Sequence, residues 1–134
     1  MSLLEVRNEP CDFPPSRRRK HRPQNETAQL CRLIEKAIAA AFAVPVDELR
    51  APTRRSAVAA FARQTAMYLA HVVLGQSYSA TGRLFGRDRT TAAHACALVE
   101  ERRDDPVVDS LLQALEQLCG ELARGSQGKA EARQ

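Results

Sequence analysis

The sequence has no tryptophan, and aromatic residues make up only 4% of its 134 positions. β-Branched residues are also few, while alanine recurs in runs, and this composition favours helices over sheets. No stretch approaches the roughly 18–20 uninterrupted apolar residues of a membrane span, and no apolar signal-peptide core follows the start. We therefore expect one compact all-α domain that is neither secreted nor inserted in a membrane.

Recognisable metal and catalytic motifs are missing as well. The four cysteines form no C-x-x-C or C-x-x-H pair, which argues against a zinc site. Cys31, Cys96 and Cys119 lie in apolar helical patterns, which indicates small buried hydrophobes in a reducing cytosol. His94 and Cys96 stand two apart on a predicted helix and point in different directions, which makes a nucleophilic pair geometrically poor. No glycine-rich phosphate loop ending in GKT or GKS occurs in the sequence. We expect no enzymatic activity, no cofactor, no bound metal and no small-molecule substrate.

Lysine is rare beside arginine, and the arginines are clustered. Between residues 50 and 89 seven arginines stand against one acidic residue, Asp88, whereas residues 104–134 carry a net negative charge. A genome rich in G·C pairs would explain the ratio of arginine to lysine but not this clustering. Clustered arginine suits bidentate recognition of phosphate or guanine better than mere solubility, so the charge pattern indicates a surface that recognises these groups.

The chain is expected to divide into three parts. Residues 1–26 surround a basic run with prolines and lack hydrophobic periodicity, which indicates a disordered basic arm, either lying along phosphates or simply solvated. Residues 27–124 form the helical domain, and residues 125–134 form a disordered polar tail. Apolar spacings of three and four, with breaks at proline and glycine, predict the helices of the domain. They are Thr27 to about Phe42, a turn at 46–49, Ser56–Leu74, two turns capped by Ser77 or Ser79 and ended by Gly86, Asp88–Arg103, and 107–122.

A short helix, a glycine-containing turn and a longer helix with a polar start form the helix-turn-helix pattern. Only the N-terminal end of the second helix reaches base edges in the major groove. Arg89, Thr90 and Thr91 would occupy that first turn, where a threonine can bond a base or phosphate and its methyl group can meet a thymine methyl. Asp88 is placed to cap the helix, a role that is compatible with a base contact.

Two stretches, residues 54–70 and 77–95, carry a family resemblance. Their most specific parts are Phe85-Gly86-Arg87-Asp88, Thr90-Thr91 and His94-Ala95. Over roughly residues 27–124 the sequence resembles the C-terminal DNA-binding domain of the bacterial replication initiator DnaA. The resemblance implies an all-α helix-turn-helix domain of the Trp-repressor-like type. It also implies binding to DnaA-box-like duplex DNA in the origin region, in a cytoplasmic, nucleoid-associated protein, with the full-length initiator or its regulators as further partners.

The resemblance also implies which residues meet DNA. Arg55 matches an arginine that enters the minor groove, and the position of Ala95 is implied to lie at the major groove. Arg89 stands where the family usually has histidine, and Ser79 stands where proline is common, also close to the bases. The longer, always charged arginine either moves the base contact to a neighbouring base pair, which changes the preferred sequence, or grips a phosphate, which only raises nonspecific affinity. The implied DNA-binding set is Arg54, Arg55, Arg63, Gln64, Ser79, Arg87, Asp88, Arg89, Thr90, Thr91, His94 and Ala95.

The sequence holds nothing that could form the AAA+ ATPase module of the initiator. We therefore expect a stand-alone DNA-binding protein that does not hydrolyse ATP. Its expected role is to regulate chromosome replication initiation, or transcription, by sharing or competing for origin boxes. The alternative is an adaptor of the initiation machinery that binds DNA weakly or not at all and contacts proteins through residues 107–122 and the basic arm.

Overall fold

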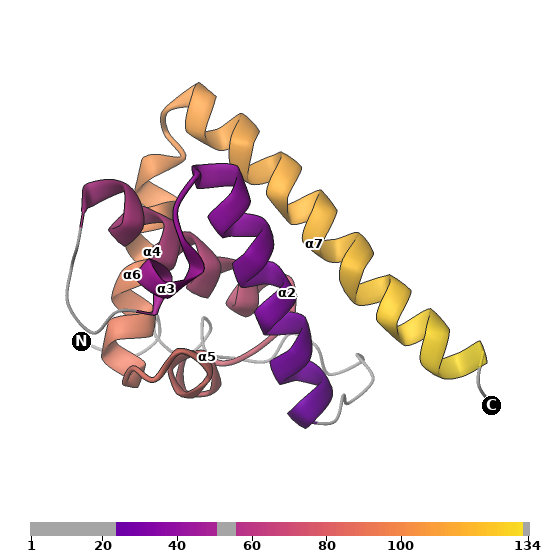
Figure 1. The fold of residues 1–134 in the computed structure, drawn as a ribbon. Coiled ribbons are helices and arrows are strands. Elements are labelled where there is room, and N and C mark those ends of the chain that lie inside the picture. The colour runs from indigo at the N-terminus through magenta and orange to yellow at the C-terminus, as the bar shows by residue number, and fades with distance from the viewer. Residues whose placement is uncertain (1–23, 51–55, 133–134) are drawn as a thin grey trace, which may run out of the picture.

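The computed structural model describes residues 24–50 and 56–132, with side chains described as far as Gly125. Every regular element in these ranges is a helix, which confirms the all-α prediction (Figure 1). The six described helices are α2 (Gln24–Phe42), α3 (Val46–Leu49), α4 (Ala57–Val72), α5 (Tyr78–Phe85), α6 (Arg89–Arg102) and α7 (Pro106–Ala132).

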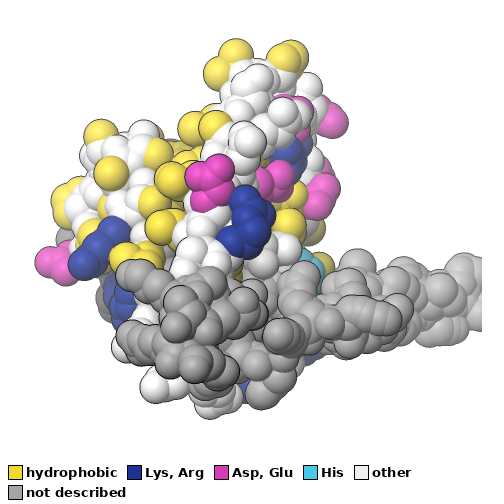
Figure 2. Space-filling model, turned by 90° about the vertical axis from the view of Figure 1, so that its right-hand side faces the viewer, with side chains coloured by type: hydrophobic (Ala, Val, Ile, Leu, Met, Phe, Trp, Pro, Cys, Tyr) yellow, Lys and Arg dark blue, Asp and Glu magenta, His cyan; other side chains and the backbone are white. Residues whose placement is uncertain are grey.

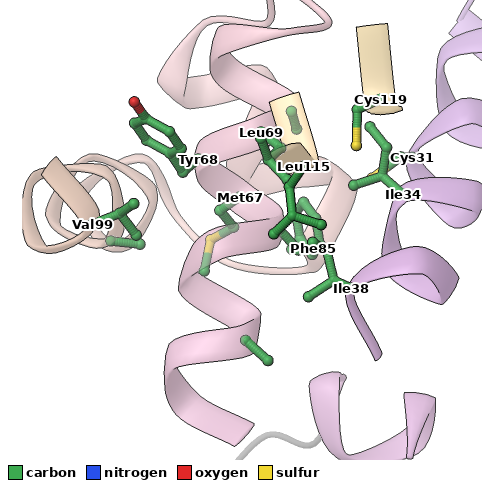
Figure 3. Packing of buried hydrophobic residues seen from close by; sticks show 14 of the residues in the cluster. Cys31, Ile34, Ile38, Met67, Tyr68, Leu69, Phe85, Val99, Leu115 and Cys119 are labelled. Atoms are coloured by element: carbon green, nitrogen blue, oxygen red, sulfur yellow. The ribbon is translucent and has the colours of Figure 1, made fainter. Parts of the chain in front are cut away.

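The hydrophobic core surrounds α4, which packs against α2, α5 and α6. Apart from Arg63 and Gln64, every residue from Ala59 to Ala70 is buried, and the many alanines let the neighbouring helices approach closely. Figure 3 shows Ile34 and Ile38 of α2 pointing toward α4, with side chains of α7 reaching the same cluster. Full burial of a side chain of this size contributes about 1.5–3 kcal/mol, so the domain is held together mainly by this cluster.

The three described cysteines behave as the sequence predicted. Cys31, Cys96 and Cys119 are buried thiols that form no disulfide. Burial raises the pKa of Cys31 to about 12 and that of Cys119 to about 11, and the nearby charges of Glu35 and Glu116 add to these shifts. Both thiols are therefore neutral at physiological pH and act as small apolar groups. Among the described residues no group of histidine, cysteine and acidic side chains is arranged to hold a metal ion.

Two helix ends differ from the prediction. The first helix begins at Gln24, and Thr27, expected as its cap, is buried inside it. Nothing after Pro23 breaks a helix, and Glu26 in the first turn is favoured by the helix dipole. The polar segment from Gly125, expected to be a tail, continues α7 to Ala132. Alanine, glutamate, lysine and glutamine favour this helix, and the two glycines of the segment oppose it. Residues 1–23 of the predicted arm lie outside the described residues.

Several apolar residues assigned to helix faces are exposed. Leu33 on α2 and Val58 and Val72 on α4 lie at the edges of their predicted apolar stripes. On α7 the buried stripe is Leu112, Leu115, Cys119 and Ala123, while Val107 is 76% exposed, with Leu111 and Leu118 also exposed. Figure 2 views the molecule from the side of α7 and shows hydrophobic side chains on that surface. Within the described helices, none is long and apolar enough to cross a membrane.

Arg103 fastens α7 to the body of the domain. Its guanidinium donates to Asp109 Oδ1 at 2.6 Å and to Glu116 Oε2 at 2.6 Å, both on α7. The same group donates to the hydroxyl of Tyr68 on α4 at 2.9 Å. Burial raises the pKa of Tyr68, which keeps its hydroxyl protonated at neutral pH. Charge-assisted bonds of this kind are stronger than neutral ones, so Arg103 joins the end of α6 to both α4 and α7.

A second ion pair joins Arg50, the residue after α3, to α2. Glu35 is only 1% exposed; its Oε1 accepts from Arg50 Nε at 3.1 Å and Nη2 at 2.9 Å, and its Oε2 lies 2.8 Å from Nη2 in the ion pair. Arg63 of α4 donates to the backbone oxygens of Leu49 at 3.0 Å and Glu48 at 3.4 Å. These bonds satisfy carbonyls at the end of α3 and hold α3 against α4.

Ala43 ends α2 in a conformation that suits glycine better. Its φ is 57°, and the bond from the Val44 N–H to the Ala39 oxygen closes the turn at 2.9 Å. A left-handed residue with a Cβ atom costs roughly 1–2 kcal/mol. We expect Ala43→Gly to raise the free energy of unfolding by about 1 kcal/mol, measured by urea denaturation. Ala40→Gly, at an exposed position inside α2, is the matched control and should destabilise the domain; equal effects of both variants would contradict this interpretation.

Candidate nucleic-acid interface

The turn between α5 and α6 is set by a glycine-ended helix terminus. Gly86 has a φ of 68°, and its N–H bonds to the Arg83 oxygen at 3.2 Å while the Arg87 N–H bonds to the Gly82 oxygen at 2.7 Å. This is the Schellman arrangement, which reverses the chain direction within two residues. The local sequence therefore fixes where α5 stops and how the chain approaches α6, as the helix-turn-helix pattern predicted.

Gly82 allows the turn to lie directly on α5. A Cβ atom at this position would meet the backbone oxygen of Arg87 at 2.6 Å and that of Asp88 at 2.8 Å. Both distances are shorter than real contacts allow, and both neighbours are backbone atoms, which cannot rotate away. A residue other than glycine would push the start of α6 away from α5.

Asp88 caps α6 from its N-terminal side. Its Oδ1 accepts from the Thr91 N–H at 2.8 Å, which confirms the predicted cap, and Ser77 caps α5 by accepting from Ala80 at 3.1 Å. The hydrogen bonds from the backbone and side chain of Thr91 hold the pKa of Asp88 below its ordinary value. Asp88 therefore stays ionised at any pH at which the domain would meet DNA, with its charge directed at its own helix.

The start of α6 presents a polar surface. Arg89, Thr90 and Thr91 in its first turn are all exposed, and His94 one turn further on is exposed as well. The opposite side of the helix is buried through Ala92, Cys96 and Val99. The structure thus brings together the predicted first-turn residues and His94 on one outward-facing side, and this arrangement can donate hydrogen bonds to base edges or phosphates.

The other predicted site residues have different surroundings. Ser79, in the first turn of α5, and Arg87, in the turn before α6, are both half-buried. Arg63 and Gln64 are half-buried on α4, and Arg63 is engaged with the end of α3 as described above. Arg54 and Arg55 lie outside the described residues, in the stretch that leads to the Ser56 cap of α4.

Ala95 lies in the core. Its side chain is 3% exposed, because it shares the inward face of α6 with Ala92 and Val99. In the domain without DNA it therefore belongs to packing and not to the outward-facing surface.

One arrangement at this surface was missed by the sequence analysis. The ring of Tyr78, the first residue of α5, stacks on the ring of His71 with centroids 4.3 Å apart and an interplanar angle of 20°. The guanidinium carbon of Arg89 lies over the same tyrosine ring, 5.8 Å from its centroid. His71 itself is half-buried on α4. The sequence signal for this arrangement was Tyr78 itself, an aromatic residue at the start of α5 in a chain with few aromatics.

The part of the chain that contains α5 and α6 matches a known protein family. A family described as the bacterial DnaA protein helix-turn-helix matches residues 31–99, more than half of the chain. The chain belongs to the bacterial DnaA helix-turn-helix family. A DnaA-type helix-turn-helix is a DNA-binding domain of the replication-initiator family, and its two helices here are α5 and α6.

Individual DnaA relatives agree with this assignment. The chromosomal replication initiator protein DnaA 1 of Protochlamydia amoebophila (strain UWE25) is 41% identical over 69 residues, covering 52% of this chain and 15% of that protein. DnaA of Acinetobacter baumannii is 38% identical over 78 residues, covering 57% of this chain and 17% of that protein. The chain thus spans less than a fifth of the length of either relative.

A solved structure shares the DnaA-type fold. It is described as a DNA replication initiation factor, and it superimposes with a TM-score of 0.67 at 28% sequence identity. The superposition covers 73% of this chain and 30% of the other. The helical arrangement around α4 is therefore shared well beyond the α5–α6 turn.

Proposed function

We propose that this domain binds double-stranded DNA in a sequence-specific manner at DnaA-box-like sites. The observation that carries the proposal is the exposed first turn of α6, Arg89-Thr90-Thr91, at the end of a tightly specified turn in a DnaA-type helix-turn-helix. Helix N-termini attract phosphate through their free N–H groups, and side chains in the first turn reach base edges. The surface can therefore attract the phosphate backbone of DNA and also make direct contacts with base edges.

In this proposal the residues have separate roles. Arg89, Thr90 and Thr91 contact base edges in the major groove, and His94 contacts the DNA from the next turn. Arg55 enters the minor groove, with Arg54 beside it. Arg87, Ser79 and Gln64 contact or support the backbone, while Arg63 holds α4 and α3 together behind them. Binding itself needs no nucleotide, and occupancy of origin boxes regulates replication initiation in the nucleoid.

The direct test is binding to a labelled DnaA-box duplex and to a scrambled duplex of the same composition. Fluorescence anisotropy at two salt concentrations, with and without ATP, should show tighter binding to the box in every condition. Specific complexes are typically at least about a thousandfold tighter than nonspecific ones. Equal affinity for both duplexes would contradict sequence-specific binding. A requirement for ATP would contradict the proposal that binding needs no nucleotide.

A second candidate function is supported by the outer face of α7. Val107, Leu111 and Leu118 expose apolar surface away from the α5–α6 turn, as expected of an adaptor that binds another protein of the initiation machinery. The DNA assay separates the two functions. If no duplex binds even at low salt, the adaptor function is favoured.

Thr91→Ala should relax selectivity at one base pair. The side chain is exposed in the first turn of α6; alanine retains the backbone N–H that Asp88 Oδ1 accepts from and removes only the side-chain hydrogen bond to Asp88. We expect a loss of about 1–3 kcal/mol of discrimination at that base pair and little change on a scrambled duplex. Ser110→Ala, an exposed hydroxyl on α7, is the matched control. An equal loss on cognate and scrambled duplexes would assign Thr91 to phosphate contact.

A further inference from the structure

Arg89 is held by an aromatic ring on the neighbouring helix. Its guanidinium carbon lies 5.8 Å from the centroid of the Tyr78 ring, within the range in which a cation is attracted to an aromatic face. The two residues open the two helices of the helix-turn-helix, since Tyr78 begins α5 and Arg89 begins α6. The contact therefore spans the two helices at the end that faces DNA in the proposed function.

The Tyr78 ring is itself fixed by α4. It stacks on the His71 ring at 4.3 Å, nearly parallel. The Nδ1 atom of His71 lies 2.7 Å from the backbone oxygen of Gln76, to which it donates when that nitrogen carries the proton. The Gln76 backbone, the His71 imidazole, the Tyr78 ring and the Arg89 guanidinium thus form one connected row of contacts that links α4 to the start of α6. The tyrosine is a preorganised platform because its partner cannot turn without losing this bond.

A fixed platform changes what an arginine can do at this position. A free arginine side chain loses up to about 2 kcal/mol of rotamer entropy when it is ordered, and a side chain already held in place loses less. The planar guanidinium presents a fork of donors that matches the O6 and N7 acceptors of guanine in the major groove. An aromatic face beneath the guanidinium limits the directions in which that fork can point.

We propose that Tyr78 is a positioning residue that determines which base pair Arg89 reads, and that this base pair contains guanine. The proposal rests on the DNA-binding function argued above and adds the source of its selectivity at one position. Tyr78 acts through Arg89 and needs no contact with DNA of its own.

The experiment measures affinity for a box duplex and for every single-base-pair variant of it. It compares the native protein with Tyr78→Leu, Tyr78→Phe, Arg89→Ala and the double variant Tyr78→Leu/Arg89→Ala. Leucine removes the aromatic face while keeping an apolar side chain, and phenylalanine restores the face without the hydroxyl. Thermal unfolding by circular dichroism defines a temperature at which all variants are folded, and the titrations are made there.

The expected result is specific to one base pair. Arg89→Ala should abolish the preference for guanine there, and Tyr78→Leu should reduce the same preference by about threefold to tenfold, with affinity for scrambled DNA within about twofold. Tyr78→Phe should keep the native preference. The double variant should discriminate no worse than Arg89→Ala alone, because Tyr78 then has no arginine to position.

Three outcomes in the Tyr78 and double variants would overturn the inference while leaving the proposed function standing. They are an unchanged preference in Tyr78→Leu, a uniform loss on all duplexes including the scrambled one, and additive losses in the double variant. A selective native protein whose Arg89→Ala variant keeps every preference would overturn it as well. A native protein that binds all duplexes equally would overturn the proposed function itself, and that result is seen before any variant is compared.

Discussion

Replacing Gly82 with alanine is expected to weaken DNA binding and to destabilise the domain. The added Cβ atom would lie 2.6 Å from the Arg87 oxygen and 2.8 Å from the Asp88 oxygen, so the turn must move away from α5. Overpacking of this kind costs typically about 1–3 kcal/mol. The displacement falls on the residue that caps α6, so the first turn of that helix shifts relative to α5. A misplacement of about 1 Å costs enzymes about a hundredfold in rate, and for binding we expect at least a tenfold loss of affinity for the box duplex.

Gly86→Ala is the matched control for this prediction. Gly86 also lies in the turn, but nothing stands within 4 Å of a Cβ atom built there. Its positive φ makes alanine unfavourable by roughly 1–2 kcal/mol, so the two variants lose comparable stability for different reasons. Urea denaturation and anisotropy titration of both proteins separate stability from geometry. If both variants bind the box duplex equally well, the close approach at Gly82 does not set the position of α6.

Raising the salt concentration should weaken DNA binding steeply. About six phosphate contacts, from the arginines between residues 50 and 89 and from the basic arm, give a slope of log affinity against log salt of about −5. Between 50 and 200 mM salt the affinity would then fall by about a thousandfold. Anisotropy titrations at four or more salt concentrations, on box and scrambled duplexes, measure the slope for both kinds of complex.

Two variants show where these contacts lie. A chain that lacks residues 1–23 should give a flatter slope if the basic arm lies along phosphates, and an unchanged slope would exclude the arm from the interface. Arg124→Ala, an exposed arginine on α7, should leave the slope unchanged. A native slope flatter than about −2 would mean that few phosphates are contacted, and the electrostatic part of the proposal would be lost.

The sequence predicted the helix-turn-helix well because the bonds that start and end its helices join residues close together in the chain. Asp88 caps α6 through a residue three positions away, and Gly86 ends α5 through bonds to residues within four positions. Such contacts depend on sequence spacing alone. The choice between Ser77 and Ser79 as the cap of α5 stayed open, because both hydroxyls precede good helical sequence, and the structure chooses Ser77.

Features that depend on contacts between helices could not be predicted. Periodicity indicates that a helix has an apolar stripe, but the neighbouring helices decide how wide the buried part is, so Leu33 and Val107 are exposed although they fit the apolar spacing of their helices. The burial of Ala95 depends on how α6 rotates against α4. The stack of Tyr78 on His71 joins two helices across a loop, and the spacing of the two residues carries no sign of it.

The bonds of Arg103 give α6 and α7 a shared orientation. The guanidinium holds Asp109 and Glu116 of α7 at the end of α6 opposite to its exposed first turn. Turning α7 relative to α6 would require breaking both charge-assisted bonds at once. A fluorophore attached at the exposed Ser110 would therefore follow the angle of α6 on a duplex, at the end of the domain away from the first turn of α6. Energy transfer from that site to labels on DNA could then measure the docking angle of each variant directly.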